Sequence, residues 1–358
     1  MGTVQDTPAR KLAGLLESIL PENRVTVAIP TLAADAKLTD CVRSLAEQTR
    51  RDFDVVVIDN SGKRLAQERL SSGCAWLHVI ENESNRGFGA AVNQACSASK
   101  SPFLATLNDD AVADPRWLEQ LLAAMESRPD VGLCASQVRL LGREELDSAG
   151  MLICGDGSSK QRGHGGSPPE YGRRDEVLAP SGSAAIYRRA MLDEIGGFDE
   201  DFFLYCEDTD LGLRARWAGW KCLYEPAAVV HHHYSHTAGR ATSLKAYYVE
   251  RNRLFLLIKN FPLRSLIAAP FVSLIRYGWH AVSLLRGRGV AARFREDGNG
   301  GGLRLVALVI RAHWSLLRNW SGVWNKRRSI ARTARISPAA FAELLRTHAI
   351  GPREVAEL

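Results

Sequence analysis

The first half of the chain alternates short apolar runs with segments in which apolar residues recur every three or four positions. Four of the runs are rich in β-branched or aromatic residues, which is typical of buried strands. They cover residues 25–29, 53–58, 76–80 and 103–107. Strands and helices that alternate through short connections predict an α/β fold, here a Rossmann-like, mostly parallel sheet flanked by helices.

The alternation continues less regularly between residues 111 and 240. The expected elements are helices over 117–125 and from 207 onward, strands over 131–136 and 222–230, and a turn running into a strand within 180–189. Residues 155–176 are rich in glycine, serine, proline and charge, so we expect a mobile loop there. Such a loop is either a lid over a site or a connection without a role in it.

Polar residues follow four of the predicted strands where each strand ends. They are Thr31, Asp59 with Asn60, Asn85, and Asn108-Asp109-Asp110. Ligands of parallel sheets bind beyond the carboxyl ends of the strands, so these residues predict one shared site. The adjacent carboxylates at 109 and 110 repel each other and are costly to desolvate, which favours a compensating cation. The alternative is an acidic turn that caps the next helix.

Two further clusters carry chemistry. Glu207-Asp208-Thr209-Asp210 opens a helix, where the helix dipole favours one capping carboxylate; a second acid is a candidate general base. His231-His232-His233 ends a strand, and imidazole is a common metal ligand. The small residues around Gly182 either let a ligand approach the backbone or let a strand pack tightly against a helix.

The C-terminal third changes character. Helices are expected over 245–259, 303–320 and 338–348, and the apolar run 265–275 is too short to span a membrane. Arg304, Arg311 and Arg318 recur every seven residues among tryptophans, which suits a helix lying in a membrane interface. The alternative is a helical appendage that packs on the rest of the chain or on a second subunit.

Composition adds three constraints to this 358-residue chain, which has room for one large domain and an appendage. Residues 286–335 hold twelve Lys or Arg and two Asp or Glu, a net +10, so the remainder carries −4 (6 minus 10). A basic segment suits anionic lipid, an acidic partner or nucleic acid, but no nucleic-acid-binding signature is present. Seven scattered cysteines without a CxxC pair, and no signal-peptide core, indicate the cytoplasm.

Read in order, the motifs resemble those of a known family. They are Ile29-Pro30-Thr31, Asp59-Asn60-Ser61, Asn85-Arg86-Gly87-Phe88-Gly89, Leu107-Asn108-Asp109-Asp110, Gly196-Gly197-Phe198-Asp199, Glu207-Asp208-Thr209-Asp210 and Val230-His231-His232. This series resembles the family 2 inverting glycosyltransferases of the GT-A fold, and within them the bacterial rhamnosyltransferase-like members that build cell-surface polysaccharide. The resemblance covers about residues 24–240.

The resemblance implies three regions and an activity. Residues 1–23 are a lead-in, 24–240 a GT-A glycosyltransferase domain, and 241–358 a helical, basic region that is membrane-interfacial or oligomerising. The implied reaction is the metal-dependent transfer of a sugar, with rhamnose as one candidate. The donor is a nucleotide diphosphate sugar, and the acceptor is a hydroxyl of a glycan or lipid-linked molecule. The protein would act as a peripheral protein at the inner face of the cell membrane, without nucleic acid and with homo-oligomerisation open.

The resemblance also implies roles for individual residues. Donor binding falls to Pro30, Thr31, Asp59, Asn60, Asn85, Arg86, Gly87, Asn108 and Asp109. The metal, Mg²⁺ or Mn²⁺, falls to Asp110 and His232, with Asn108 and His231 as further candidates. Asp208 is the implied general base, beside Glu207, and Gly182 and Ser183 are assigned to the acceptor. Asn108 departs from the family's DxD-type motif, in which a carboxylate stands at this position.

Two other functions remain open on the sequence. A nucleotidyltransferase acting on a sugar phosphate would usually show a glycine-rich loop after the first strand, and residues 30–34 contain no glycine. A catalytically inactive, membrane-associated scaffold is favoured only by Asn108, whereas the intact Glu207-Asp208 pair disfavours it.

Overall fold

The computed structural model describes residues 23–70, 74–233, 242–287, 289–296 and 301–358. The expected lead-in therefore lies outside the described residues except for its last position. The expected boundary near residue 240 lies outside them as well.

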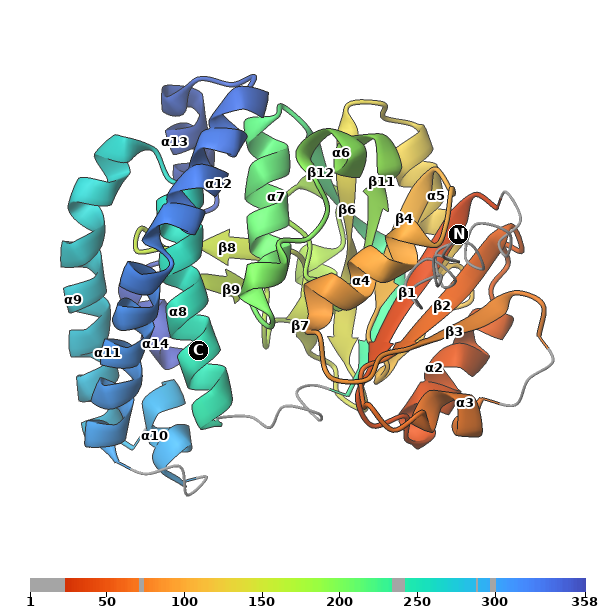
Figure 1. Ribbon diagram of the computed structural model, residues 1–358, viewed down its shortest axis with the longest axis horizontal. Helices are drawn as coiled ribbons and strands as arrows, with labels where there is room; N and C mark the ends of the chain where they lie inside the picture. The colour runs from red at the N-terminus through yellow and green to blue at the C-terminus, as the bar shows by residue number, and fades with distance from the viewer. Residues whose placement is uncertain (1–22, 71–73, 234–241, 288, 297–300) are drawn as a thin grey trace, which may run out of the picture.

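A single ten-stranded sheet forms the centre of the molecule (Figure 1). Its main path runs β10-β12-β6-β11-β4-β1-β2-β3, with β5 paired to β12 and β7 paired to β6. The strands are β1 (Val25–Thr31), β2 (Phe53–Asp59), β3 (Leu77–Glu81), β4 (Phe103–Leu107), β5 (Ala111–Ala113), β6 (Val131–Leu140), β7 (Leu146–Ser148), β10 (Asp175–Glu176), β11 (Ala184–Arg188) and β12 (Lys221–His232). A separate hairpin joins β8 (Met151–Ile153) to β9 (Ser159–Gln161).

The four N-terminal strands are parallel, as the alternating pattern predicts. Their carboxyl ends therefore meet at one edge of the sheet. The antiparallel strand β11 lies between β4 and β6, and β12 runs parallel to β6. The register of β12 against β5 and β6 brings His232 opposite Ala111, directly after the carboxylates that follow β4.

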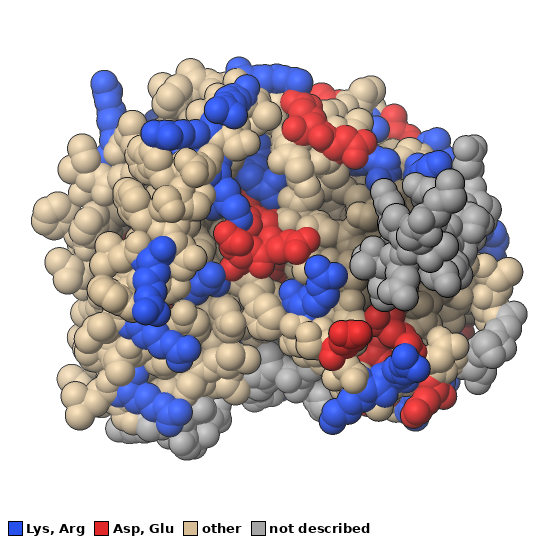
Figure 2. All heavy atoms as spheres, in the orientation of Figure 1, with Lys and Arg blue, Asp and Glu red and all other residues tan. Residues whose placement is uncertain are grey.

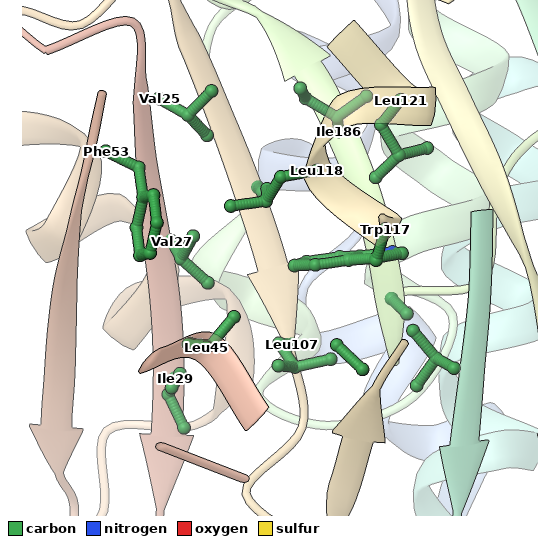
Figure 3. Packing of buried hydrophobic residues seen from close by; sticks show 14 of the residues in the cluster. Val25, Val27, Ile29, Leu45, Phe53, Leu107, Trp117, Leu118, Leu121 and Ile186 are labelled. Carbon is green, nitrogen blue, oxygen red and sulfur yellow. The ribbon is translucent and has the colours of Figure 1, made fainter. Parts of the chain in front are cut away.

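Helices cover both faces of the sheet because successive strand residues point to opposite sides. One face packs against α2 (Ala36–Ala46) and α5 (Trp117–Glu126), the other against α4 (Phe88–Ser97), α6 (Arg189–Ile195) and α7 (Glu207–Trp217). The short α3 (Leu65–Arg69) follows β2. Figure 3 shows Trp117 and Leu118 of α5 packed beside Leu107 and Ile186 of the sheet.

The C-terminal helices pack against α7 and form the end of the molecule opposite β3 (Figure 1). They are α8 (Ser243–Asn260), α9 (Leu263–Leu285), α10 (Gly289–Glu296), α11 (Gly302–Arg318), α12 (Trp320–Thr333), α13 (Pro338–Thr347) and α14 (Pro352–Glu357). Trp217 of α7 stacks on Phe341 with ring centroids 4.0 Å apart, and its Nε1 donates to the Asn260 carbonyl at 2.8 Å. The expected helical C-terminal region is thus confirmed, and it shares a hydrophobic core with α7.

Residues 155–176 differ from the expected loop. They contain β9, a short 3₁₀ helix over Pro168–Tyr171 and β10. Asp156, at the start of the segment, is fully buried, with Arg276 at 2.6 Å and Arg253 at 3.6 Å. Turns connect these short elements, but glycine, proline and charge mark only such local turns. They do not show that a distant pair of arginines anchors the segment.

Candidate active site

A cavity of about 560 Å³ opens at the carboxyl ends of β1, β2 and β4. From there it extends along β9 and the start of α7 to residues of α8, α9, α10 and α11. Most of the residues expected in the site line it: Pro30, Thr31, Asn60, Asn85, Gly87, Asn108, Asp109, Asp110, Gly182, Ser183, Glu207, Asp208 and His232. The strand-end residues thus meet in one place, as the parallel sheet required.

His232 joins the acidic turn after β4 to a carboxylate that the sequence did not indicate. Its Nε2 lies 3.0 Å from Asp110 Oδ1, and its Nδ1 lies 2.8 Å from Asp147 Oδ2. Burial alone would lower the pKa of His232, but the hydrogen bonds to Asp110 and Asp147 raise it to about 10. The same contact with His232 outweighs burial at Asp110 and lowers the pKa of that carboxyl.

Asp109 behaves differently from its neighbour. Its carboxylate accepts a hydrogen bond from Thr31 Oγ1 at 2.6 Å, which ties the turn after β4 to the end of β1. Burial raises the pKa of Asp109 to about 6, and the charge of Asp110 adds to the effect. The two adjacent acids therefore have separate partners, one a hydroxyl and the other an imidazole.

Short polar contacts hold the loops that follow β2 and β3. Asn60 donates to the Gly87 carbonyl at 3.2 Å, and Asn85 accepts from the Gly87 amide at 2.8 Å. Gly87 has φ +86°, and a Cβ there would lie 2.2 Å from the Phe203 carbonyl oxygen. Only glycine therefore lets this loop pass so close to the backbone at 203.

Asp208 also lines the cavity, at the start of α7. Its carboxylate accepts from the Gly182 amide at 2.8 Å and from the Thr209 amide at 2.6 Å. Burial raises the pKa of Asp208 while those N–H donors oppose the rise. The adjacent Glu207 is buried, and among the described residues its Oε2 has no hydrogen-bond partner. Burial, followed by the charge of Asp208, raises the pKa of Glu207 to about 8.

The turn that leads into Asp208 has an unusual backbone. Phe203, Tyr205 and Cys206 all have positive φ, at 62°, 70° and 68°. Three residues of one turn with positive φ are strained, so contacts from another element must hold the turn in this conformation. Asn252 of α8 supplies it, because its side-chain nitrogen lies 2.8–2.9 Å from three carbonyls of this turn, those of residues 202, 204 and 205.

Three of the expected site residues do not line the cavity. Both carboxylate oxygens of Asp59 accept backbone N–H groups, from Ser61 and Ala66, each at 2.8 Å. Arg86 is exposed. His231 lies on the other side of β12 and contacts Asp114 at 3.3 Å, since neighbouring strand residues point to opposite faces.

The sequence reasoning missed Asp147 and Asn252. Asp147 lies in the short strand β7, which has no motif, and 85 residues separate it from His232. Asn252 stands in a run of four polar residues, Glu250-Arg251-Asn252-Arg253, in the middle of α8. That run was a signal of buried polar contacts, but it did not say with which turn they would form.

Asp110, His232 and Asn108 are the candidate side chains for holding a divalent metal. Across the described ranges, no group of three or more His, Cys, Asp or Glu side chains is arranged to hold a metal ion. Asp110 and His232 do converge, and Asp147 orients His232 through Nδ1, as carboxylates orient metal-bound histidines. The Asn108 amide lies 3.2 Å from His232 Nε2. Because the Asn108 side-chain nitrogen faces His232, the side chains that would hold a divalent metal are Asp110 and His232, and phosphate oxygens of a bound ligand would complete the site.

Comparison with known proteins gives a consistent result. A family model described as "Glycosyltransferase like family 2" matches residues 21–255. An N-acetylglucosaminyl-diphospho-decaprenol L-rhamnosyltransferase of Mycobacterium tuberculosis is 28% identical over 242 residues, which are 60% of this chain and 77% of the relative. An O-antigen biosynthesis protein of Myxococcus xanthus is 26% identical over 59% of this chain and 17% of its own.

The fold has a similar solved structure, GalNAc-T7 with UDP, GalNAc and Mn²⁺. The TM-score is 0.58 at 16% identity, over 84% of this chain and 57% of that chain. At this identity the likeness concerns the fold.

Proposed function

Because this chain belongs to the family 2 glycosyltransferases, we propose that it transfers a sugar from a nucleoside diphosphate donor to a hydroxyl of a lipid-linked glycan. The family match confirms the enzyme class, and the fold comparison confirms the expected GT-A fold. The decaprenol-linked substrate in the mycobacterial relative's name supports the acceptor class, and that relative makes rhamnose the first sugar to test. The family match also disfavours the nucleotidyltransferase alternative.

The observation that carries the proposal is that two acidic groups line one cavity. The first is Asp110 with its partner His232, and the second is Asp208. The Asp208 carboxylate is fixed by two N–H donors, so it is oriented to accept a proton from an acceptor hydroxyl. That oxygen then attacks the anomeric carbon of the donor sugar, which inverts the configuration there. Gly182, whose N–H bonds Asp208, packs closely on Phe88, because a Cβ there would lie 3.2 Å from Phe88 Cε1.

The strand-end residues, together with Asp110 and His232, serve the donor. Thr31, Asn60 and Asn85 line the end of the cavity at which a nucleoside would bind, and Asp109 is held by Thr31. Asp110 and His232 would hold Mg²⁺ or Mn²⁺, which when bound neutralises charge on the departing diphosphate. Binding through Nε2 requires His232 to release a proton, while its Nδ1 stays bonded to Asp147.

The function is tested by measuring donor hydrolysis and transfer across a panel of nucleotide sugars, with Mg²⁺, with Mn²⁺ and with EDTA. Asp208→Asn should reduce transfer about a thousandfold, in the range that general base catalysis contributes, and leave nucleotide binding nearly unchanged. Asp193→Asn, a change at an exposed aspartate, is the control. Near-normal transfer by Asp208→Asn would remove Asp208 from the role of base. No turnover of any donor by the unmodified protein would favour the inactive scaffold.

We also propose that α9 and α11 lie on an anionic membrane surface at the cytoplasmic face. Ile267, Phe271 and Leu274 form an exposed apolar stripe along α9. A second stripe runs along α11, which carries three arginines and no acidic residue. Its apolar members are Leu303, Val306, Ile310, Trp314 and Leu317. Apolar stripes flanked by arginine and tryptophan suit a lipid interface.

The charge distribution agrees with that surface. On the face drawn in Figure 2, a row of basic side chains runs over the end that holds α11, and no acidic ones lie beside them. In the part of the chain that is described, no helix has the length and hydropathy to cross a membrane. The proposed contact is therefore one of helices lying along the surface.

A further inference from the structure

Two sequence motifs lie next to each other near the proposed base. They are Asn85-Arg86-Gly87-Phe88-Gly89, at the start of α4, and Gly196-Gly197-Phe198-Asp199, which follows α6. Asn93 of α4 joins them, because its side-chain nitrogen donates to the Phe198 carbonyl and its oxygen accepts from the Phe198 amide, each at 2.9 Å. The second motif is therefore fixed to the helix that the first one opens.

The ring of Phe88 is held at this junction. It meets the ring of Phe198 edge to face, with centroids 5.9 Å apart and planes at 81°, and Phe198 meets the buried Tyr187 in the same way at 5.5 Å. Gly89 leaves room for Phe198, since a Cβ at Gly89 would lie 2.9 Å from Phe198 Cβ. Edge-to-face packing is favourable and depends on ring orientation. The Phe88 ring is thus kept in one place along the cavity that it lines.

The tip of this ring packs on the peptide that orients Asp208. A Cβ at Gly182 would lie 3.2 Å from Phe88 Cε1, 3.3 Å from Phe88 Cζ and 3.4 Å from Asp208 Cβ. Gly182 therefore touches the ring while its N–H bonds the Asp208 carboxylate at 2.8 Å. If the ring carbons were absent, this peptide could move into their space, and its N–H would lose its aim at the carboxylate.

The backbone of Phe88 contacts a second part of the same region. Its N–H donates to the Phe203 carbonyl at 2.9 Å, and Phe203 belongs to the turn with positive φ that precedes Asp208. Asn252 bonds the carbonyls of residues 202, 204 and 205, so Phe88 supplies the donor for the remaining one. One residue thus contacts both the turn before Asp208 and the peptide that bonds its carboxylate.

We propose that Phe88 is a positioning residue for Asp208: its ring keeps the Gly182 N–H directed at the carboxylate, and its backbone holds the turn at Phe203. The inference rests on the proposed role of Asp208 as the base. Phe88 directly follows Gly87 in the loop that lines the end of the cavity proposed for the nucleotide. The base therefore takes its orientation from the same loop that serves the donor.

Phe88→Leu removes the ring carbons that reach Gly182 and leaves the backbone bond to Phe203 in place. It should lower kcat about tenfold, because Asp208 loses a well-aimed hydrogen bond to its charged form. KM for the donor should stay within about threefold, since the polar contacts that hold Gly87 remain.

Phe53→Leu is the matched control. Phe53 also meets an aromatic ring edge to face with centroids 5.9 Å apart, that of Trp76, but it stands at the amino end of β2. Its loss should lower Tm about as much as Phe88→Leu and leave kcat within about twofold of the unmodified protein. Equal losses of kcat in the two variants would mean a general loss of stability and would overturn the positioning role.

Gly182→Ala tests the same contact from the other side. Gly182 has no positive φ, so its backbone accepts alanine, but the new methyl group would press on Phe88 Cε1 and lower kcat about threefold. In the double variant the leucine vacates the space that the methyl group fills. Independent effects would multiply to a loss of about thirtyfold, whereas we expect about threefold. A multiplicative loss would mean that the two residues do not act through their contact.

An NMR titration separates this inference from the proposed function. With ¹⁵N-glycine labelling, the Gly182 amide signal is identified by its absence in Gly182→Ala, and its pH dependence reports the pKa of Asp208. Phe88→Leu should raise that pKa, because the Gly182 N–H is one of the donors that lower it. Three ionisable neighbours share charge interactions with Asp208 and remain in this variant: Glu207, Cys206 and Tyr187.

The sign of the change decides the outcome. A lower pKa for Asp208 would mean that Phe88→Leu only admits water, and the positioning role would fail. If the unmodified protein transfers no sugar but the pKa rises in Phe88→Leu, the contact stands and the proposed function fails. If sugar is transferred and Phe88→Leu changes neither kcat nor this pKa, the inference fails and the function stands.

Discussion

At the scale of residues, Glu207 and Asp208 show how two adjacent acids acquire different properties. Asp208 accepts two backbone N–H groups that stabilise its charge, whereas Glu207 Oε2 is buried and no described residue bonds it. Burial and the neighbouring charge raise the pKa of Glu207 to about 8, so at neutral pH it is mostly protonated. Environments that push the pKa values of neighbouring carboxyls apart are a common way to assign separate roles.

A pH-dependent stability follows from Glu207. Its pKa is about 8 in the folded chain against 4.5 for the reference group, so the folded state holds the proton more tightly. The folded state therefore loses stability as the pH rises from about 4.5 to about 8. Glu207→Gln carries no proton to lose, so its advantage over the unmodified protein should grow through this window. We expect its Tm advantage to be about 2 °C larger at pH 8 than at pH 5.

Scanning fluorimetry at the two pH values measures this difference. Glu68→Gln, at an exposed glutamate, should show the same Tm change at both. A Tm difference for Glu207→Gln that does not depend on pH would mean that Glu207 is ionised in the folded protein.

At the scale of elements, α8 holds the start of α7 in place. Asn252 bonds three carbonyls of the strained turn before Asp208, and Asn260 donates to Asp210 at 2.9 Å. Lys259 and Arg214 also lie 2.8 Å from the Asp210 carboxylate. The third acid of the Glu207–Asp210 cluster is therefore structural. The helix that follows the sheet domain thus supports the turn on which the proposed base depends.

Asn252→Ala should lower kcat about tenfold, because three buried carbonyls lose their donor and the turn before Asp208 loses its geometry. KM for the donor should change less than kcat, since Asn252 bonds residues 202, 204 and 205 directly, whereas the loop at Gly87 meets this turn only at residue 203. Steady-state kinetics with circular dichroism at the same temperature measures both effects. The exposed Asn319→Ala is the matched control. A rise in donor KM with kcat intact, or a loss of helix signal, would contradict this positioning role.

At the scale of the whole molecule, the sheet end and the helical end differ in the charge and polarity of their side chains. The sheet end provides polar and acidic groups, which suit the proposed nucleotide donor, while the helical end provides arginines and the exposed residues Phe271 (67%) and Ile310 (63%). The cavity connects these ends past Asp208. A soluble donor and a membrane-bound acceptor could therefore reach the same base from opposite sides.

The double substitution Phe271→Glu and Ile310→Glu should reduce flotation with anionic liposomes about tenfold, because it removes apolar burial and adds repulsion. Transfer to a short-chain, water-soluble acceptor should be retained. Leu141→Glu, at an exposed leucine far along the chain from these helices, is the control. Unchanged flotation would contradict the membrane contact. Dimerisation that the double substitution abolishes, without liposome binding by the unmodified protein, would indicate a second copy of the chain on this face.

The sequence by itself determined the α/β class, the order of the strands in the chain and the polar residues at their ends. These features are local: residue spacing decides strand or helix, and parallel strands bring their carboxyl ends together. The motif series was enough to indicate the family and the candidate base. It could also single out Asp110 as a candidate metal ligand, because the polar residues of that turn are adjacent in the sequence.

Only the tertiary structure decided which distant side chains meet. The register of β12 chose His232 over His231 for the cavity, since neighbouring residues of a strand face opposite sides. Asp147 and Asn252 reach the site from β7 and α8, and no local pattern marks them. Contacts over such separations depend on sheet pairing and helix packing, which the spacing of residues along the chain does not contain.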